Sequence, residues 1–551
     1  MDVLFGRNKK EQLEPVRATV TGKIPTWLQG TLLRNGPGMH TVGETSYNHW
    51  FDGLALLHSF AIKDGEVYYR SKYLRSDTYN ANIEANRIVV SEFGTMAYPD
   101  PCKNIFSKAF SYLSHTIPDF TDNCLINIMK CGEDFYATTE TNYIRKINPQ
   151  TLETLEKVYS QHQLIIRKYV AVNLATSHPH YDEAGNILNM GTSIVDKGKT
   201  KYVIFKIPAA APGRKKGTSP LKRTEVYCSI PSHSLLSPSY YHSFGITKNY
   251  VIFLEQPFRL DILKMATAYI RGVNWASCLA FHGEDKTYIH IIDQRTRKPV
   301  QMKFYTDPMV VFHHVNAYEE DGCILFDVVA YEDNSLYQLF YLANLNQNFN
   351  EHSRLTSFPT LRRFAVPLHV DKNAEVGSNL IKVASTTATA LKEKDDQIYC
   401  QPELLFEGLE LPRINYAHNG KPYRYIFAAE VEWSPVPTKI IKYDILTKSS
   451  IRWGEENCWP AEPLFVPTPG AKDEDDGVIL STVISTDPQK QPFLLILDAK
   501  SFTEVARAFV DVDMHLDLHG IFIPGADWDA RKQAPSQKPR DRDSDGVAPQ
   551  T

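Results

Sequence analysis

The sequence lacks the features of a secreted or membrane-spanning protein. It has no run of 18 apolar residues, and its 8 cysteines include no Cys-x-x-Cys pair. Residues 1–16 contain no apolar signal-peptide core, and their acidic residues argue against a transit peptide. We therefore expect a cytosolic (cytoplasmic) protein with reduced thiols, whose contact with membranes is at most peripheral.

The sequence also has no large excess of either charge. Its 60 Lys and Arg against 64 Asp and Glu give a net charge of −4. This balance excludes a strongly basic nucleic-acid-binding protein and a highly charged disordered chain. With 43% hydrophobic and 11% aromatic residues in 551, the composition is that of a globular, enzyme-sized protein.

Long amphipathic helices are scarce, and short strand-like runs recur instead. Examples are Tyr250-Val-Ile-Phe-Leu, Cys323-Ile-Leu-Phe-Asp-Val-Val and Val478-Ile-Leu-Ser-Thr-Val-Ile. This pattern predicts an all-β protein, either a propeller or a sandwich. Length alone suggests three or four domains, although a propeller of this size is one unit. No sequence repeat of fixed period supports a propeller from the pattern itself.

Two apolar stretches with interspersed basic residues depart from this pattern, at 99–113 and 258–271. They are either helices packed on the core or a surface that touches a lipid membrane. If the second interpretation holds, the residues at a membrane-facing entrance are Phe106, Phe110, Leu113, Leu263 and Met265. The polar segment 526–551 predicts a disordered tail.

Four segments rich in histidine stand out among the 18 histidines. They are Ser177-His-Pro-His, Tyr241-His-Ser, Phe312-His-His and His515-Leu-Asp-Leu-His. No His-Glu-x-x-His motif is present, and the four segments are spread over some 340 positions. On pattern alone a structural role is commoner than metal ligation.

Strings along nearly the whole chain resemble the carotenoid cleavage oxygenase family. In family order they include Leu33-Arg-Asn-Gly-Pro-Gly, His49-Trp-Phe-Asp-Gly, Thr139-Glu-Thr-Asn, Glu410-Leu-Pro-Arg and Ala461-Glu-Pro-Leu-Phe-Val. The resemblance implies a seven-bladed β-propeller with a helical and loop cap over the iron-bearing face. It implies a single catalytic domain over residues 1–525.

The resemblance also implies one Fe²⁺ per chain. Its expected ligands are His178, His242, His313 and His519, and the family's carboxylates that orient these rings match Glu140, Glu410 and Glu462. The adjacent His180, His314 and His515 are expected not to bind metal. Imidazole suits ferrous iron, and each ring needs its second nitrogen fixed by a partner.

The implied reaction is cleavage of the central 15,15′ double bond of β-carotene, or a related provitamin A carotenoid, by O₂ to give retinal. Tyr331 is the candidate to stabilise a polyene cation with its π face, ahead of Trp50 and Phe51. The alternatives are eccentric carotenoid cleavage, retinoid isomerohydrolysis, or a propeller that binds carotenoid without turnover.

One segment departs from the family pattern. Residues 159–166 look longer than expected, and we predict a surface loop there that leaves the position of His178 intact. Cys102 lies beside the apolar 103–113 stretch, where a cysteine is a weak signal for acylation.

Overall fold

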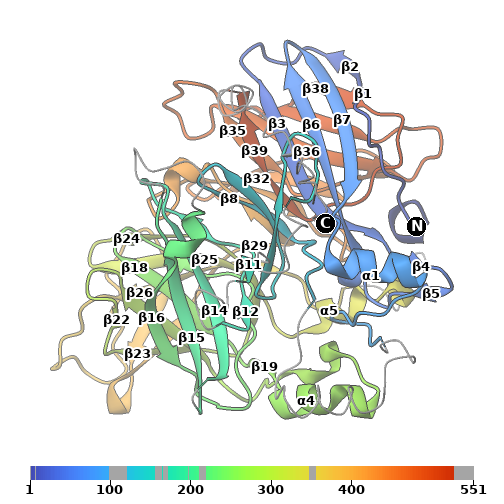
Figure 1. The fold of residues 1–551 in the computed structure, drawn as a ribbon. Coiled ribbons are helices and arrows are strands. Elements are labelled where there is room, and N and C mark those ends of the chain that lie inside the picture. Colours follow the sequence, from blue (N-terminus) through green and yellow to red (C-terminus); the bar gives the residue numbers. More distant parts are fainter. Residues whose placement is uncertain are drawn as a thin grey trace, which may run out of the picture.

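The computed structural model describes residues 2–6, 8–97, 121–155, 164–165, 172–196, 198–209, 219–345 and 355–525. Strands dominate these residues (Figure 1). The predicted entrance residues Phe106, Phe110 and Leu113 lie outside the described residues, as do Cys102, most of 159–166 and the tail at 526–551.

Two sheets contain the ends of the described chain and exchange strands. In spatial order the first holds β1 (Val16–Arg17), β7 (Glu66–Tyr73), β6 (Leu54–Lys63), β3 (Gly30–Met39) and β39 (His519–Pro524). The second holds β2 (Thr19–Gly22), β38 (Glu504–Phe509), β37 (Phe493–Asp498), β36 (Gly477–Ser485) and β34 (Cys458–Pro460), with β35 (Leu464–Pro467) also on β36. An early strand thus completes the late sheet and the last strand completes the early one, which closes the fold.

Five further sheets of the described residues begin in succession along the chain between these two, and β27 and β28 return to the third of them after β26. The first contains β8 (Asn127–Cys131), β9 (Asp134–Thr138), β10 (Tyr143–Ile147) and β11 (Leu164–Ile165), and the second contains β12 (Leu174–Ala175), β13 (His180–Tyr181), β14 (Ile187–Asp196), β15 (Lys199–Ile207) and β16 (Glu225–Pro231). The third contains β17 (Gly245–Ile246), β18 (Tyr250–Glu255), β21 (Thr287–Asp293), β22 (Lys298–Pro299), β23 (Lys303–Thr306), β27 (Thr389–Lys392) and β28 (Gln397–Gln401). The fourth contains β24 (Val310–Glu320), β25 (Cys323–Tyr331), β26 (Thr360–Pro367) and β29 (Glu403–Glu407), and the fifth contains β30 (Leu409–Arg413), β31 (Tyr425–Glu430), β32 (Lys439–Asp444) and β33 (Ser449–Trp453). Two small ribbons pair β4 (Thr41–Val42) with β5 (Thr45–Ser46), and β19 (Phe258–Leu260) with β20 (Leu279–Phe281).

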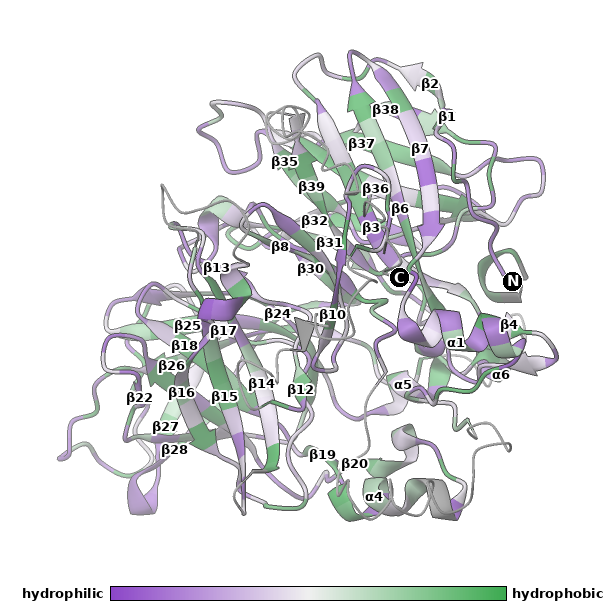
Figure 2. Ribbon diagram, viewed as in Figure 1, coloured by the Kyte–Doolittle hydropathy of each residue, from purple (hydrophilic) through white to green (hydrophobic). Residues whose placement is uncertain are grey.

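Each sheet packs on the next through buried apolar side chains, and the series returns to its start. Figure 2 shows hydrophobic residues to be frequent along the strands. One contributing pair from each successive junction is Leu57 and Ile128, Tyr136 and Val203, Ile204 and Phe253, Ile291 and Phe326, Val329 and Ile441, Phe427 and Phe493, and Leu494 and Phe60. The predicted all-β propeller is therefore confirmed, with its core distributed between sheets.

The helical part of the cap is smaller than predicted. The described α-helices are α1 (Asp77–Ala85), α4 (Ile262–Arg271), α5 (Ser335–Leu339) and α6 (Leu342–Leu345). Single turns occur at η1 (Asp2–Gly6), η2 (Trp50–Asp52), η3 (Pro220–Arg223), η4 (Trp275–Cys278), η6 (Lys394–Asp396) and η7 (Tyr416–His418). In the described residues, the connections between sheets run mainly as loops, and the apolar side chains are buried mostly between strands. Little apolar surface is therefore left for cap helices to cover.

The helix α4 lies at the edge of the molecule, beside β19 (Figure 1). Its Met265 and Ala268 are buried, whereas the Leu263 side chain on the same helix is 60% exposed. Among the described residues, no helix combines the length and apolar character needed to cross a bilayer.

Candidate metal centre

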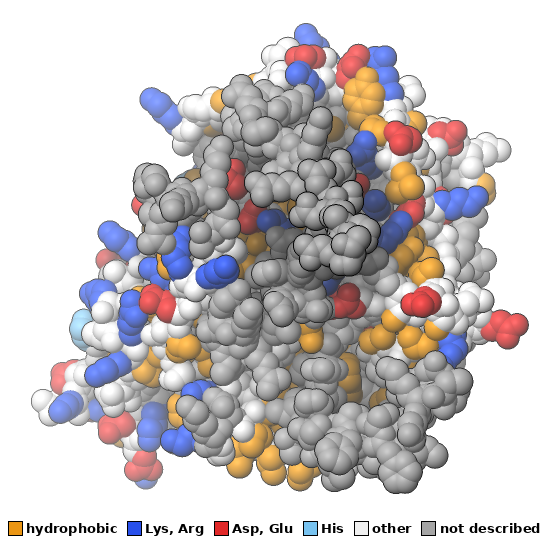
Figure 3. Space-filling model, viewed as in Figure 1, with side chains coloured by type: hydrophobic (Ala, Val, Ile, Leu, Met, Phe, Trp, Pro, Cys, Tyr) orange, Lys and Arg blue, Asp and Glu red, His pale blue; other side chains and the backbone are white. Residues whose placement is uncertain are grey.

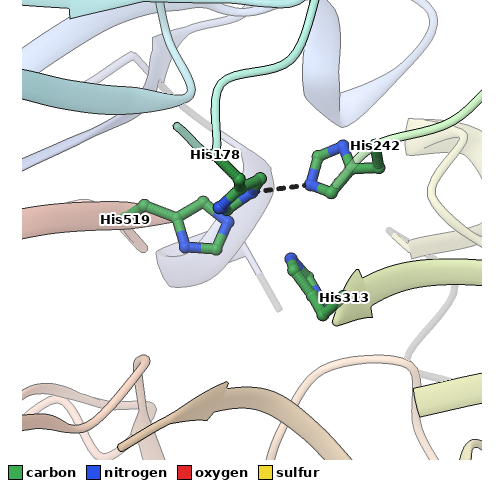
Figure 4. A group of neighbouring side chains, drawn as sticks. All are labelled: His178, His242, His313 and His519. Atoms are coloured by element: carbon green, nitrogen blue, oxygen red, sulfur yellow. Dashed lines mark hydrogen bonds between the residues drawn. The ribbon is translucent and has the colours of Figure 1, made fainter. Parts of the chain in front are cut away.

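Four histidines, each on or beside a strand of a different sheet, converge on one point (Figure 4). His178 lies in the connection between β12 and β13, and His242 lies just before β17. His313 is within β24, and His519 is the first residue of β39, the closing strand. The structure therefore brings together all four residues that the family resemblance implied as ligands.

The four rings are close enough to share one ion. One ring nitrogen from each lies within 4.8 Å of those of the others. The Nε2 atoms of His178 and His242 are 2.9 Å apart, and the ring centroids of His178 and His519 are 4.5 Å apart. Four imidazoles at this spacing are typical of ligands around a single metal ion.

Three of the rings are oriented by the three predicted glutamates. His313 Nδ1 lies 2.8 Å from Glu410 Oε2, and His519 Nδ1 lies 2.6 Å from Glu462 Oε2. His242 Nδ1 likewise contacts Glu140 Oε1. Because each carboxylate occupies Nδ1, that nitrogen carries the proton and Nε2 is left with a free lone pair.

The remaining nitrogens fit a metal ion. His313 Nε2 is buried and has no hydrogen-bond partner, an arrangement that costs free energy unless something binds there. Three carboxylates and four neutral imidazoles around a dipositive ion bring the net charge of the site to −1. Nitrogen ligands of this kind suit ferrous iron and other transition metals, and the donor set offers no carboxylate oxygen directly.

The electrostatic environment favours neutral imidazoles and ionised carboxylates. Burial, together with the nearby His519 and His242, lowers the pKa of His178 well below its usual value. Burial also lowers the pKa of His519 to about 4, against the opposing effect of Glu462. Burial alone would raise the pKa of Glu462, but His519 and two arginines lower it to about 2. Neutral imidazoles can bind a metal ion through a free lone pair, and ionised carboxylates offset its positive charge.

Burial acts to lower the pKa of His313 as well, but the Glu410 carboxylate outweighs it and raises that pKa. A metal ion at Nε2 would compete directly with this extra proton.

The neighbouring histidines have other surroundings. His180 Nε2 lies 2.7 Å from the carbonyl oxygen of Phe244. His515 is buried against His58, with 4.4 Å between their ring centroids. Neither these two nor His314 falls among the groups of described residues whose ligand atoms converge.

A cavity of about 270 Å³ opens beside the four histidines. His242, His313 and His519 line it, whereas His178 does not. The wall is otherwise mainly apolar and aromatic, and it includes Trp50, Phe51, Phe93, Leu260, Phe312, Tyr331, Leu336, Tyr337 and Phe340. One side of the metal centre therefore faces a space suited to a hydrocarbon ligand.

Tyr331 lines this cavity and is 1% exposed. Its hydroxyl donates a hydrogen bond of 3.1 Å to Glu410 Oε1. The position is compatible with the predicted role toward a polyene, and it adds a second role, the support of the carboxylate on His313.

Sequence reasoning missed several residues that support the site. The Tyr240 hydroxyl donates to both oxygens of Glu140, at 2.8 and 2.9 Å, and accepts from the Tyr337 hydroxyl at 2.6 Å. Arg34 lies 2.9 Å from Glu462 Oε1 and 2.6 Å from Asp517 Oδ1, with every one of these side chains buried. Asp517 is two residues before His519, but this spacing alone does not predict that its carboxylate binds Arg34.

The rim of the cavity includes one of the two described entrance candidates. Met265 is 4% exposed and lines the cavity, so it faces inward. Leu263 faces outward. In Figure 3 hydrophobic side chains gather along the lower edge of the molecule, where Figure 1 places α4.

Comparison with known proteins agrees with this geometry. A family model described as retinal pigment epithelial membrane protein matches residues 5–524. The chain is 85% identical over 546 residues to the β,β-carotene 15,15′-dioxygenase of Homo sapiens, covering 99% of each chain. It is 69% identical to the enzyme of that name from Gallus gallus, covering 97% of this chain and 100% of the other. Cobalt-substituted Synechocystis ACO has the same fold, with a TM-score of 0.71 at 21% identity over 94% of this chain and 98% of the other.

Proposed function

Because the chain belongs to the carotenoid oxygenase family, we propose that it cleaves the central double bond of β-carotene with O₂ to give two molecules of retinal. The observation that carries this proposal is the four-histidine centre opening on one side into an apolar cavity. Identity of 85% to a β,β-carotene 15,15′-dioxygenase over nearly the whole chain supports the substrate and the bond.

We propose Fe²⁺ as the resident metal, held by His178, His242, His313 and His519. When bound, ferrous iron supplies the redox chemistry that makes O₂ reactive toward a double bond. Glu140, Glu410 and Glu462 keep the Nδ1 protons of three rings in place and hold each Nε2 toward the metal.

The cavity wall positions the substrate by shape. A carotene has no polar group in its middle, so hydrogen bonds cannot fix which double bond reaches the centre. The aromatic residues Phe51, Phe312 and Tyr337 instead enclose the polyene and exclude water. The ring of Tyr331 would meet positive charge developing on the chain.

The finer architecture belongs to the same proposal. We propose a ring of seven blades, and we assign one blade to each of the seven sheets of four or more strands that occur among the described residues. We further propose a cytosolic enzyme, in keeping with buried free thiols such as Cys124, that touches lipid through α4 and draws carotenoid past Leu263 and Met265.

The test is reconstitution with a defined metal. The protein is purified without oxygen in the presence of Fe²⁺, β-carotene and O₂ are added, and the products are identified by chromatography and mass. Two retinal molecules per β-carotene support the proposal. A pair of unequal apocarotenals would show eccentric cleavage, and iron binding without carotenoid consumption would redirect the assay to retinyl esters. Carotenoid retained by a chain that binds no iron would indicate a carrier.

A further inference from the structure

A second histidine–carboxylate cluster lies outside the four-histidine centre. It consists of His233, in the loop after β16, Glu255, at the end of β18, and His290, in β21. One ligand atom from each lies within 4.8 Å of the other two. His290 Nε2 is 3.0 Å from Glu255 Oε1, and His233 Nδ1 contacts the same oxygen. Three elements distant in the sequence thus aim nitrogen and oxygen donors at one point.

The surroundings hold each donor in place. The ring of His233 stacks on Tyr288 with 4.0 Å between centroids, and the ring of His290 stacks on Phe253 at 5.6 Å. The second oxygen of Glu255 accepts a hydrogen bond of 2.8 Å from the Tyr202 hydroxyl. Donors fixed in this way lose little freedom when an ion binds, which is the usual support around a metal site.

The Glu255 side chain remains charged despite its burial. It is 6% exposed, and burial alone would raise its pKa, but His233 and His290 lower that pKa to about 2. The negative charge of Glu255 therefore faces the nitrogen atoms of both rings.

A polar pocket of about 120 Å³ adjoins the cluster. Its walls are His233, Ser234, Ser237, Ser239, Glu255, Gln256, Arg259, Lys286 and Tyr288. The Arg259 charge is offset by Asp285, 2.8 Å away. The pocket can therefore hold water, which would complete the coordination of an ion bound to only three protein atoms.

We propose that His233, Glu255 and His290 form a second metal site, which takes a zinc-class divalent ion through Nδ1, Oε1 and Nε2, respectively. Two imidazoles, one carboxylate and one water are a tetrahedral donor set that Zn²⁺ accepts. The 3.0 Å separation of His290 Nε2 from Glu255 Oε1 must widen by a few tenths of an ångström for ligands about 2.0–2.1 Å from the ion. The His233 Nδ1 contact with the same oxygen must widen as well, and the half-exposed ring of His233 has room to move.

Binding there would couple to the first centre through the chain. The backbone N–H of Ser239 donates to the hydroxyl of Tyr202, which in turn donates to Glu255. Ser239 also lies in the wall of the main cavity, three residues before His242. Two hydrogen bonds therefore connect Glu255 to the loop that leads to a ligand of the main centre.

The experiment is a Zn²⁺ titration of the full chain after the four-histidine centre has been filled with Fe²⁺ and excess iron removed, without oxygen. Calorimetry and metal analysis give the number of Zn²⁺ ions bound and their affinity. We expect one further Zn²⁺ per chain, with a rise in thermal midpoint as Zn²⁺ is added. His233→Ala and Glu255→Gln should each weaken this binding at least about 100-fold, since a direct ligand contributes more than its supports.

A matched control comes from a looser cluster in the turn between β20 and β21. His282 Nδ1 lies 3.4 Å from Glu284 Oε1, and these side chains are 37% and 74% exposed. Because this pair is exposed and lies outside the proposed site, His282→Ala should leave the added Zn²⁺ in place. His233 is half-exposed, so its variant tests the site even if the variant of the buried Glu255 fails to fold. No saturable Zn²⁺ beyond the iron site in the parent protein would overturn the proposal. Equal retention by the His233 variant would also overturn it, as would equal loss in the His282 variant.

Discussion

The carboxylates of Glu462 and Glu410 perform the same task on different histidines, but their surroundings predict different costs for their removal. Glu462 accepts from His519 and also lies 2.9 Å from the guanidinium of Arg34, with both side chains at most 2% exposed. Glu410 accepts from His313 and from the Tyr331 hydroxyl, and no arginine or lysine of the described residues forms an ion pair with it. Replacing each by glutamine keeps the shape and removes the charge.

The magnitudes follow from these partners. Removing one member of a buried ion pair costs about 3–5 kcal/mol of folding free energy when the other charge is left uncompensated. For Glu462 the cost lies at the lower end of this range, because Asp517 remains 2.6 Å from Arg34. Removing a buried acceptor from neutral donors costs about 1–3 kcal/mol. Loss of a group that orients a metal-bound imidazole costs about 10–100-fold in metal affinity in either case. We therefore expect Glu462→Gln and Glu410→Gln to lose iron to a similar extent, while Glu462→Gln destabilises the fold more than Glu410→Gln does.

Two measurements separate these effects. Iron affinity is read by competition with a ferrous chelator, and folding is read as the urea midpoint of the metal-free proteins, so that metal binding does not contribute to stability. The reasoning would be refuted if Glu410→Gln unfolded at the same urea concentration as Glu462→Gln, or if either variant retained iron as the parent does.

Further substitutions test single contacts. His313→Ala should abolish iron binding, whereas His314→Ala should retain measurable iron; equal iron loss, by metal analysis, would show that the wrong residue of the pair had been assigned. Tyr240→Phe removes the hydroxyl that holds Glu140 and should weaken iron about tenfold with the fold intact; unchanged chelator competition would contradict this. Leu263→Asp should lower binding to phospholipid vesicles by at least about tenfold, since burying a leucine is worth about 1.5–3 kcal/mol, and unaltered sedimentation with vesicles would remove α4 from the contact.

The sequence predicted the strands better than it predicted their assembly. Runs such as 250–254 and 323–329 have strand length and composition, and the structure has strands there. The closure of the ring had no local signal, because β39 pairs with β3 across some 480 residues. Only the resemblance to a known family favoured the propeller over a sandwich. The cap was overestimated because apolar stretches such as 258–271 divide into a short strand and a short helix.

The metal ligands were beyond any spacing rule for the same reason. His178 lies in the connection between β12 and β13, whereas His519 begins β39 of another sheet. Their separation along the sequence therefore does not predict that their ring centroids are 4.5 Å apart. The supporting residues Tyr240 and Arg34 were missed because a buried polar partner looks like any other tyrosine or arginine in a sequence. Their signal exists only once the fold shows which carboxylate each one meets.

Placing one ligand on the strand that closes the ring couples metal binding to closure. His519 begins β39, and the strand beside it, β3, carries Arg34, which binds both Glu462 and Asp517. An ion that binds only the closed ring stabilises it by about 2.7 kcal/mol at a free concentration 100 times its Kd. Removing the metal should therefore speed amide hydrogen exchange in β39 and β3 more than in β15. The strand β15 supplies no ligand, and it pairs only with β14 and β16, which are its neighbours in the sequence, so it plays no part in closing the ring. Equal acceleration in β15 would mean that the metal stabilises the propeller as a whole, and that His519 is a ligand without being part of a closing device.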